Sequence, residues 1–514
     1  MYENNQNSWQ TVSDASQLPV GNWEGETEDN VNVPWVSLLL WTVLLSFFSV
    51  LNPLFTHLAT NLQSQELYAS WAMTQGQLAY TNIFTTSGLL FEALSWISGY
   101  LPFHLLLWVG EFLALWISGV ATFRLSYHIT QDRRISKTLA QLFYGLVAVF
   151  GLGGLYATVY ALPFLLWMAN FVIAYTRGKV SDKRFILYGL MGAVSFLIAP
   201  FATVILAGVA FITLLITNIR QGKKAAGIYQ FLATLFGFSL AFYPLAYATV
   251  WNGSFGDAVG QVVFDLTNIH LYHSHFWLNL IVYLVISFLL GIGYALFYVL
   301  KAGQKHSFEA SLFAVLGFVV VWFFSLFNPD FGLYHLLAAL PFVLMLLAIW
   351  QSHLMDKRFG GAHSRRSARQ ETAFYRYMTS SHFLPLIAVL LALACPLVDQ
   401  VLLHGSVNQE RQQLASYLTK KTSKQDKIYA WDTSASLYTA SQRLSAAAIL
   451  SPSLYVTNSE NRIDLTNSLQ TNAPRYIVVN NQVTVSKDLK KILADNYQET
   501  SEKFSHFKLY QLKQ

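Results

Sequence analysis

Charge and cysteine are scarce in this chain of 514 residues. Lys, Arg, Asp and Glu together make up 12% of it, whereas hydrophobic residues make up 54%. Soluble globular domains contain about 25% charged residues, so the composition excludes an ordinary soluble protein. The single cysteine, Cys395, lies in an apolar run before Pro396. One cysteine forms no intrachain disulfide, so it does not indicate a redox compartment.

The short motifs of phosphate binding and hydrolysis are also missing. No GxxxxGK[ST], GxGxxG, HExxH or GxSxG segment occurs in a context that supports it. The net charge of +6 comes mostly from short loops between apolar runs, so no nucleic-acid site is predicted. The spacing of His270, His273 and His275 permits metal binding, but no Cys or nearby Glu completes a site. We therefore expect no metal and no cofactor.

Long apolar runs recur between Trp35 and Leu403. A transmembrane helix needs about 20 such residues, and by this rule the chain contains about eleven spans. The expected fold class is therefore a polytopic α-helical membrane protein. The expected spans centre on residues 34–54, 103–127, 139–155, 157–176, 185–200, 202–219, 227–250, 277–300, 310–327, 335–352 and 383–402.

Basic residues in the short loops predict how the chain is oriented. They follow the even-numbered spans, in loops at residues 132–137, 177–184, 220–224, 301–305 and 356–376. Because Lys and Arg are retained on the cytoplasmic side, we expect a cytoplasmic N-terminus with a polar tail over residues 1–33. The transmembrane part is expected over residues 34–405. No cleavable signal peptide is predicted, because the tail lacks a basic n-region.

The remaining residues, 406–514, have the sequence pattern of a soluble domain. "KIYAW" (427–431), "RYIVV" (475–479) and "HFKLYQL" (506–512) predict short strands, and helical patterns stand between them. Alternating helices and strands over this length predict one small α/β domain. By the charge rule, this domain faces outward and is extracytoplasmic.

The first outward loop holds the polar, aromatic stretch "NLQSQELYASWAMTQGQLAYTNIFTTSG" (61–88), and we expect interfacial helices in this loop. The stretch resembles the corresponding loop of the membrane-embedded GT-C glycosyltransferases, of the protein mannosyltransferase and lipid A aminoarabinose transferase type. The segment "NPDFGLYHLLAALPFVLMLL" (328–347) and the tail resemble later parts of that superfamily. The residues that carry the first resemblance are Glu66, Tyr68, Gly76, Tyr80, Asn82 and Phe84.

This resemblance implies transfer of a sugar from a polyprenyl-phosphate carrier to a cell-surface glycan, polymer or lipid on the outer face of a bacterial membrane. Many superfamily members use an Asp in the first outer loop as base, where this chain has Gln65. Glu66 is then either the replacement base or a structural charge. Asp330, five residues before His335, is the second candidate, with helix capping as its alternative role.

Aromatic and polar residues near the outer face are candidates for binding the donor sugar and its phosphate. They are Tyr68, Trp71, Tyr80, Asn82, His270, His273 and His335. Glu111 lies within the second span and is expected to pair with a polar neighbour. "GLGG" (151–154) is interpreted as close helix packing.

Two other functions stay open beside the transferase. One is a catalytically silent partner of a surface-glycan assembly complex, which keeps the lipid groove and lacks the base. The other is a transporter of lipid-linked sugars. The transporter is disfavoured because no pair of broken helices stands at matching positions in two halves.

Overall fold

A computed structural model of the protein describes residues 32–271, 273–302, 308–359, 377–378 and 380–513. Most of the N-terminal tail expected over residues 1–33 lies outside the described residues. The same is true of most of the two basic loops at residues 301–305 and 356–376.

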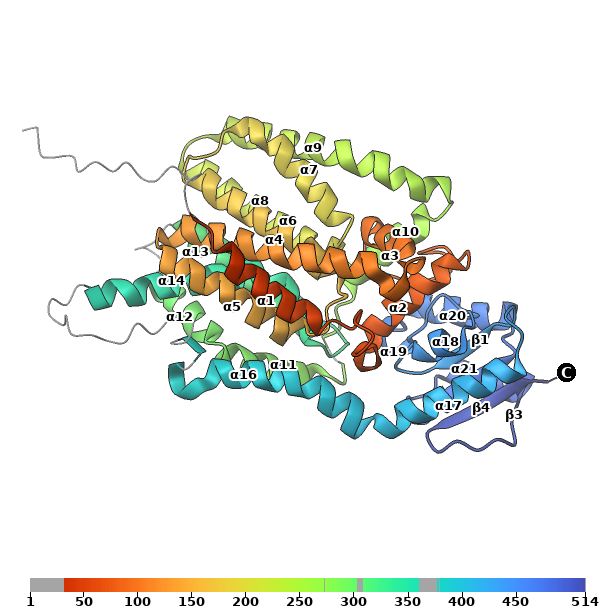
Figure 1. Ribbon diagram of the computed structural model, residues 1–514. Coiled ribbons are helices and arrows are strands. Elements are labelled where there is room, and N and C mark those ends of the chain that lie inside the picture. Colours follow the sequence, from red (N-terminus) through yellow and green to blue (C-terminus); the bar gives the residue numbers. More distant parts are fainter. Residues whose placement is uncertain (1–31, 272, 303–307, 360–376, 379, 514) are drawn as a thin grey trace, which may run out of the picture.

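A bundle of long helices forms the larger part of the molecule (Figure 1). Its helices are α1 (Trp35–Phe47), α4 (Leu105–Thr130), α5 (Arg133–Gly151), α6 (Ala157–Thr176), α7 (Phe185–Phe196), α8 (Pro200–Arg220), α9 (Lys224–Trp251), α11 (Phe276–Leu289), α12 (Ile292–Ala302), α13 (Phe308–Phe327), α14 (Leu340–Phe359) and α16 (Ser380–Leu397). Short 3₁₀ turns are η2 (Thr56–Leu58), η3 (Pro102–His104), η4 (Asp182–Arg184) and η5 (Leu333–Ala339), and a π-helical turn, η6 (Val398–Leu403), follows α16.

Every span expected from the sequence contains a helix, but the helices differ in length. Within the described residues, seven are long and apolar enough to cross a membrane, or eight if α11 and α12, bent by 77°, form one broken span. The other three expected spans correspond to α1, α5 and α7. Helix α1 has 13 residues and α7 has 12, which is less than the roughly 20 needed for a crossing, and α5 begins with basic residues. The chain is a multi-pass membrane protein.

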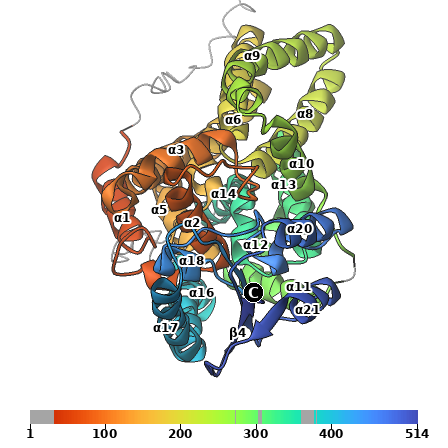
Figure 2. The same ribbon diagram turned by 90° about the vertical axis from the view of Figure 1, so that its right-hand side faces the viewer.

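Three further helices lie at the end of the bundle that meets the C-terminal part (Figures 1 and 2). They are α2 (Asn61–Thr74), α3 (Leu89–Gly99) and α10 (Phe255–Thr267). Helix α2 contains the polar stretch of the first loop, yet ten of its 14 residues are buried. The sequence predicted an interfacial helix with one face exposed to water. Instead, other parts of the protein cover α2 on opposite sides.

Residues from 405 onward fold as an α/β unit around one four-stranded sheet. The strands lie in the order β1-β2-β4-β3, with β1 and β2 parallel and the other pairs antiparallel. The predicted strands at 427–431, 475–479 and 506–512 correspond to β1, β2 and β4. The elements are α17 (Gly405–Lys421), β1 (Ile428–Trp431), α18 (Ser436–Ser441), α19 (Pro452–Tyr455), α20 (Ser459–Thr471), β2 (Tyr476–Asn480), α21 (Lys487–Asn496), β3 (Tyr497–Glu499) and β4 (Phe507–Leu512).

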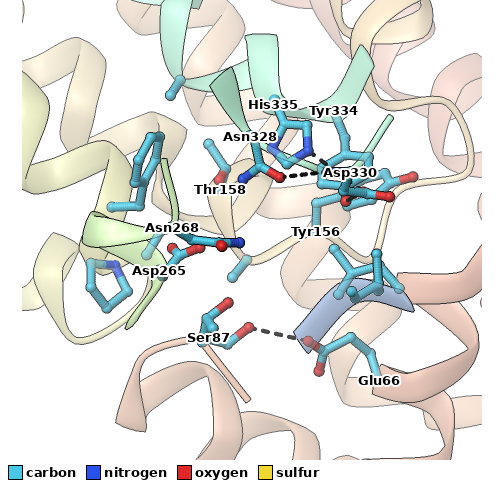
Figure 3. A pocket seen from close by; sticks show the side chains of 18 of the residues that line it. Glu66, Ser87, Tyr156, Thr158, Asp265, Asn268, Asn328, Asp330, Tyr334 and His335 are labelled. Carbon is cyan, nitrogen blue, oxygen red and sulfur yellow. Dashed lines mark hydrogen bonds and ion pairs between the residues drawn. The ribbon is translucent and has the colours of Figure 1, made fainter. Parts of the chain in front are cut away.

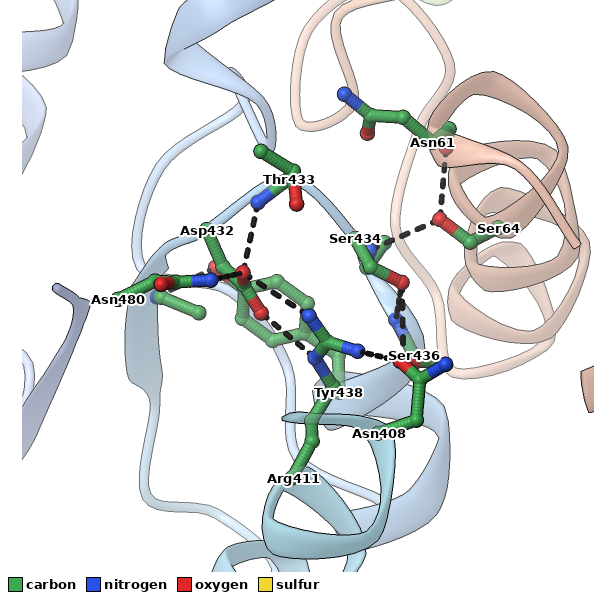
Figure 4. Close-up of polar contacts among 12 residues, drawn as sticks. Asn61, Ser64, Asn408, Arg411, Asp432, Thr433, Ser434, Ser436, Tyr438 and Asn480 are labelled. Atoms are coloured by element: carbon green, nitrogen blue, oxygen red, sulfur yellow. Dashed lines mark hydrogen bonds and ion pairs between the residues drawn. The ribbon is translucent and has the colours of Figure 1, made fainter. Parts of the chain in front are cut away.

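The C-terminal unit shares a hydrophobic core with α2. Tyr68, Ala69, Ala72 and Met73 pack in one cluster with residues of α17, α18 and the sheet. The turn after β1 contacts the first turn of α2, where Ser64 lies (Figure 4). The helix that carries Glu66, the first predicted catalytic residue, is therefore held by both parts of the chain.

Candidate active site

The polar residues at the start of α2 are buried because each has a specific partner. Thr60 and Gln63 form a capping box, in which the Gln63 side chain accepts from the Thr60 backbone N–H at 2.9 Å. The Gln63 amide also donates to the carbonyls of Leu152 (3.2 Å) and Gly154 (2.8 Å). Asn61 donates to Ser451 Oγ of the C-terminal unit at 2.8 Å. These bonds fix the helix that carries Glu66.

A cavity of about 130 Å³ lies beside α2, between the bundle and the C-terminal unit (Figure 3). Three of the residues proposed from the sequence, Glu66, Asp330 and His335, line it together. The full lining is Leu62, Glu66, Thr86, Ser87, Leu155, Tyr156, Ala157, Thr158, Ala199, Pro200, Phe201, Phe264, Asp265, Asn268, Asn328, Asp330, Tyr334, His335, Ala338, Leu454 and Tyr455.

Glu66 is only 6% exposed and has one free oxygen. Its Oε1 accepts from Ser87 Oγ at 3.1 Å, whereas its buried Oε2 has no hydrogen-bond partner within the described residues. Burial raises the pKa of Glu66 well above its usual range, and the negative charge of Glu92 adds to the shift. A buried oxygen without a partner is uncommon and points to a ligand or proton that completes it.

Asp330 and His335 stand on the opposite wall, at the start of η5. Asp330 Oδ2 accepts a hydrogen bond from the Tyr334 hydroxyl and lies 3.6 Å from His335 Nε2, within ion-pair distance. Tyr334 in turn stacks on Tyr156, with ring centroids 5.2 Å apart. The carboxylate of Asp330 is therefore more fully partnered than that of Glu66.

A third carboxylate, Asp265 of α10, completes the polar wall. Burial raises the pKa of Asp265 to about 6, and the nearby His335 opposes part of this shift. Asp265 lines the cavity on the side of α10. Leu454 and Tyr455, from the C-terminal unit, close the cavity on another side.

The predicted aromatic ligands lie outside this cavity. The Tyr68 hydroxyl accepts from the Ser445 backbone N–H at 2.8 Å, and its ring packs 5.1 Å from that of Tyr438. Trp71 packs against Tyr68 at 5.8 Å. Both rings therefore face the core of the C-terminal unit, because apolar contacts there cover this side of α2.

Tyr80 and Asn82 have local structural contacts. The Tyr80 hydroxyl donates to the Ser87 carbonyl at 3.0 Å, and the Asn82 side chain accepts from the Leu78 backbone N–H at 3.0 Å. Tyr80 thus supports the segment that presents Ser87 to Glu66. Asn82 closes an exposed turn and does not reach the cavity.

The histidines after α10 bind neighbouring segments. His270 Nε2 is 3.2 Å from Asn268 Oδ1, His273 Nε2 donates to the Leu326 carbonyl at 3.1 Å, and His275 Nδ1 donates to the Pro329 carbonyl at 2.9 Å. They fasten the chain after α10 to the segment before Asp330. None of the three lines the cavity.

Several cavity residues were not singled out from the sequence. They are Ser87, Tyr156, Thr158, Asn268, Asn328, Tyr334 and Tyr455. Asn328 and Tyr334 lie in the segment whose resemblance was noted, so that segment was the available signal. Tyr156 and Tyr455 come from distant segments with no motif. The lining contains no Lys or Arg, so anion binding there depends on His335 and neutral N–H and O–H groups.

Solved proteins of similar structure define the class of the fold. ArnT from Cupriavidus metallidurans bound to undecaprenyl phosphate matches with a TM-score of 0.55 and 13% identity, over 92% of this chain and 96% of its own. The same protein in the apo state matches with a TM-score of 0.55 and 12% identity, over 93% and 97%. At such identity the likeness shows the fold alone, so the chain has the fold of ArnT.

Two family models match almost the whole sequence. The model described as "Putative competence-induced protein Ccs4 N-terminal domain" covers residues 26–404, and "Putative competence-induced protein Ccs4 C-terminal domain" covers residues 408–513. The chain belongs to this Ccs4 family. None of the curated proteins matches it.

Proposed function

We propose that this protein is a membrane glycosyltransferase that moves a sugar from a polyprenyl-phosphate carrier to a cell-surface glycan, polymer or lipid. The GT-C fold supports the proposal, as does its likeness to ArnT bound to undecaprenyl phosphate. In this proposal about eleven spans cross the membrane and the N-terminus is cytoplasmic. Residues 34–405 bind the lipid-linked donor, and residues 406–514 form an outer domain over the cavity.

The observation that carries the proposal is the free Oε2 of Glu66 at the cavity. The lipid tail of a donor stays among the helices, so its reacting carbon reaches only the polar end of the bundle. There Glu66 takes the proton of an acceptor hydroxyl. The acceptor oxygen attacks the anomeric carbon, the bond from that carbon to the phosphate oxygen breaks, and the lipid phosphate leaves with the electron pair.

The wall opposite Glu66 suits the leaving phosphate. His335, Asn328 and Asn268 bring N–H groups to the cavity, and Thr158 brings a hydroxyl. Donors aimed at developing negative charge stabilise the transition state. Asp330 keeps Tyr334 in place and lies beside His335. We therefore assign Asp330 to orienting this wall and Glu66 to the base.

One observation favours a catalytically silent partner as the second candidate. The cavity has three carboxylates and lacks Lys and Arg, which usually meet a phosphate. A silent partner has no need for such groups. The two functions differ in one measurable property, the turnover of a lipid-linked sugar.

The test uses the full chain in nanodiscs with undecaprenyl-phosphate-linked glucose, mannose or an aminopentose, each radiolabelled in the sugar. Membrane envelope extract supplies the acceptors. We expect sugar transfer and release of undecaprenyl phosphate with one donor. Glu66→Gln should lower the rate about 10²–10⁴-fold, because the size and polarity remain and the base is lost.

Asp464→Asn is the matched control, because Asp464 is an exposed carboxylate on α20, outside the cavity lining. It should transfer at the wild-type rate. If Asp330→Asn stops transfer and Glu66→Gln does not, Asp330 is the base. If no donor is turned over and undecaprenyl phosphate does not bind, the silent partner replaces the enzyme.

A further inference from the structure

Helices α2 and α3 run side by side in the same direction, and this arrangement brings two glutamates together. Ser70 Oγ of α2 donates to the Ser95 carbonyl of α3 at 2.7 Å. A Cβ atom added at Gly99 would lie 2.2 Å from the Ser70 carbonyl oxygen. One turn before this crossing, α2 carries Glu66 and α3 carries Glu92. The two carboxylates therefore lie on neighbouring helices at the same level, and the charge of Glu92 acts on Glu66.

Each of the two carboxylates is held by one hydroxyl and leaves one oxygen free. Ser87 Oγ donates to Glu66 Oε1 at 3.1 Å, and Thr85 Oγ1 donates to Glu92 Oε1 at 2.7 Å. Both Oε2 atoms are buried and have no hydrogen-bond partner in the part of the chain that the structure describes. Neither carboxylate forms an ion pair within that part.

The hydroxyl-bearing segment between the helices is itself rigid. The Ser87 backbone N–H donates to Thr85 Oγ1 at 3.2 Å, and the Thr85 N–H donates to Gln261 Oε1 at 3.0 Å. The Gln261 amide donates to the Tyr80 carbonyl at 2.7 Å. Because the hydroxyls are fixed, neither Glu66 nor Glu92 gains a second donor by a small rotation of its neighbours.

No Lys or Arg of the described residues lines the cavity beside the pair. Glu66 is 6% exposed and Glu92 is 2% exposed. Tyrosine hydroxyls surround them, from Tyr80, Tyr160 and Tyr455, and the opposite wall adds Asp265, Asp330 and His335. Two buried like charges cannot both ionise at moderate cost, so a proton stays in such a site.

The electrostatics of Glu92 agree with this geometry. Burial raises the pKa of Glu92 to about 7, opposed in part by the Thr85 hydroxyl. Burial, together with the negative charge of Glu92, raises the pKa of Glu66 well above its usual range. The pair then loses its protons in two titration steps, and neither step is assigned to one residue alone.

We propose that Glu66 and Glu92 share one proton between their free oxygens and act as a single acid pair, with Glu92 as the positioning residue. The proposal rests on the proposed function. In the resting state the pair carries one negative charge. The acceptor O–H bond breaks as its proton moves to Glu66, and the pair becomes neutral. After the lipid phosphate leaves, one proton passes to water and the pair returns to its resting state.

Infrared difference spectroscopy tests the pair without any substrate. The full chain in nanodiscs is titrated between about pH 5 and pH 9, and the carbonyl stretch of protonated carboxyl groups is followed. All variants carry Asp265→Asn, because Asp265 also titrates in this window. In this background we expect the pair to lose the band in two separate steps. Adding Glu66→Gln or Glu92→Gln should remove one of these steps and move the other below the upper step of the intact pair. Variants that titrate at the positions of the intact pair would overturn the proposal.

The pH profile of transfer supplies the second measurement. Glu92→Gln keeps the size of the side chain and removes its negative charge, so the acid limb should move down by about one pH unit or more. If Glu92 had only a structural role, Glu92→Gln would lower the rate of transfer equally at every pH and would not shift the acid limb. Absence of transfer in the wild type would contradict the proposed function, whereas the infrared steps would still decide whether the pair shares a proton.

Discussion

The hydroxyl of Ser64 accepts a hydrogen bond from the backbone N–H of Ala435, 2.9 Å away, and so ties the helix of Glu66 to the C-terminal unit. Ala435 belongs to the turn that follows β1. Asp432 begins this turn and is 1% exposed. Its carboxylate accepts from Arg411 Nε at 2.7 Å and Nη2 at 3.1 Å (Figure 4). One buried ion pair thus holds the turn that contacts α2.

Breaking this pair should destabilise the protein strongly. In Asp432→Asn the buried Arg411 guanidinium loses its counter-charge, which typically costs about 3–5 kcal/mol. The Arg475–Asp426 pair is the matched control, with side chains 49% and 26% exposed and the same 2.7 Å separation as the Arg411–Asp432 pair. Asp426→Asn should cost about 0–1 kcal/mol. Thermal unfolding in nanodiscs measures the loss of stability in each variant. Equal losses in Asp432→Asn and Asp426→Asn would contradict the idea that the buried pair stabilises the protein more than the exposed pair.

The C-terminal unit shows how far the sequence alone could predict this fold. Its strands are apolar runs bounded by polar turns, so β1 and β2 begin within one residue of the predicted starts. Three-residue β3 was not predicted, because a strand that short has no pattern of its own. The spans were located by hydropathy, but hydropathy does not determine the helix length, as α1 and α7 show.

The sequence pointed to Glu66, Asp330 and His335, which share the cavity, through two segments that resemble a known superfamily. Asp330 and His335 are five residues apart and line one wall. Tyr455 reaches the cavity of Glu66, and Glu92 reaches the helix beside it, through packing that no local pattern predicts. Tyr68 and Trp71 pack against the C-terminal unit and not in the cavity, which the sequence could not indicate because an aromatic residue packs equally well against lipid, sugar or another domain. "GLGG" was interpreted as close helix packing. Gly151, which ends α5, packs so closely on Leu337 that an added Cβ atom would lie 2.9 Å from it, and the loop that follows has positive φ at Gly153, Gly154 and Leu155.

The stability of the protein should fall as the pH rises from acid to neutral. The pKa of Glu92 is about 7 in the folded chain, compared with about 4.3 in an unfolded chain. Between these values the folded state binds more protons, so the stabilising contribution is full below about pH 4.3 and is lost as the pH rises through about 7. We expect the unfolding midpoint of the wild type to decrease across this window.

Glu92→Gln removes this titration and should flatten the pH dependence of the unfolding midpoint. Glu499→Gln is the control, because Glu499 is exposed on β3, and its curve should run parallel to that of the wild type. Parallel curves for all three proteins would show that Glu92 does not titrate in this window.

The charge rule predicts that residue 423 is outside the cell and residue 366 is inside. Cys395 is exposed, so the test starts from a Cys395→Ser background. In intact cells, a membrane-impermeant maleimide should label Ser423→Cys and leave Arg366→Cys unlabelled. Both should be labelled after the membrane is opened. Labelling of Arg366→Cys alone would reverse the orientation and place the cavity on the cytoplasmic side.

Glu111 holds the loop that presents Tyr156 to the cavity. Its side chain is 1% exposed, and its Oε2 accepts from Ser49 Oγ at 3.0 Å and from the Leu155 N–H at 3.2 Å. The sequence predicted a polar partner for Glu111, and these bonds confirm it. Gly154 has φ +63° at this point, and an added Cβ atom would lie 2.2 Å from both Glu111 carboxylate oxygens.

Gly154→Ala should therefore displace Glu111 and, through Leu155, the Tyr156 ring that stacks on Tyr334. A misplacement of about 1 Å at a reacting site can lower a rate about 10²-fold, and we expect a loss of transfer of this size. Gly178 is the matched control: its φ is +73°, but an added Cβ atom meets nothing within 4 Å. Gly178→Ala has the same left-handed backbone strain, about 1–2 kcal/mol, without the collision. Equal effects of the two substitutions on transfer would show that backbone strain alone is responsible, and that Glu111 does not position the cavity wall.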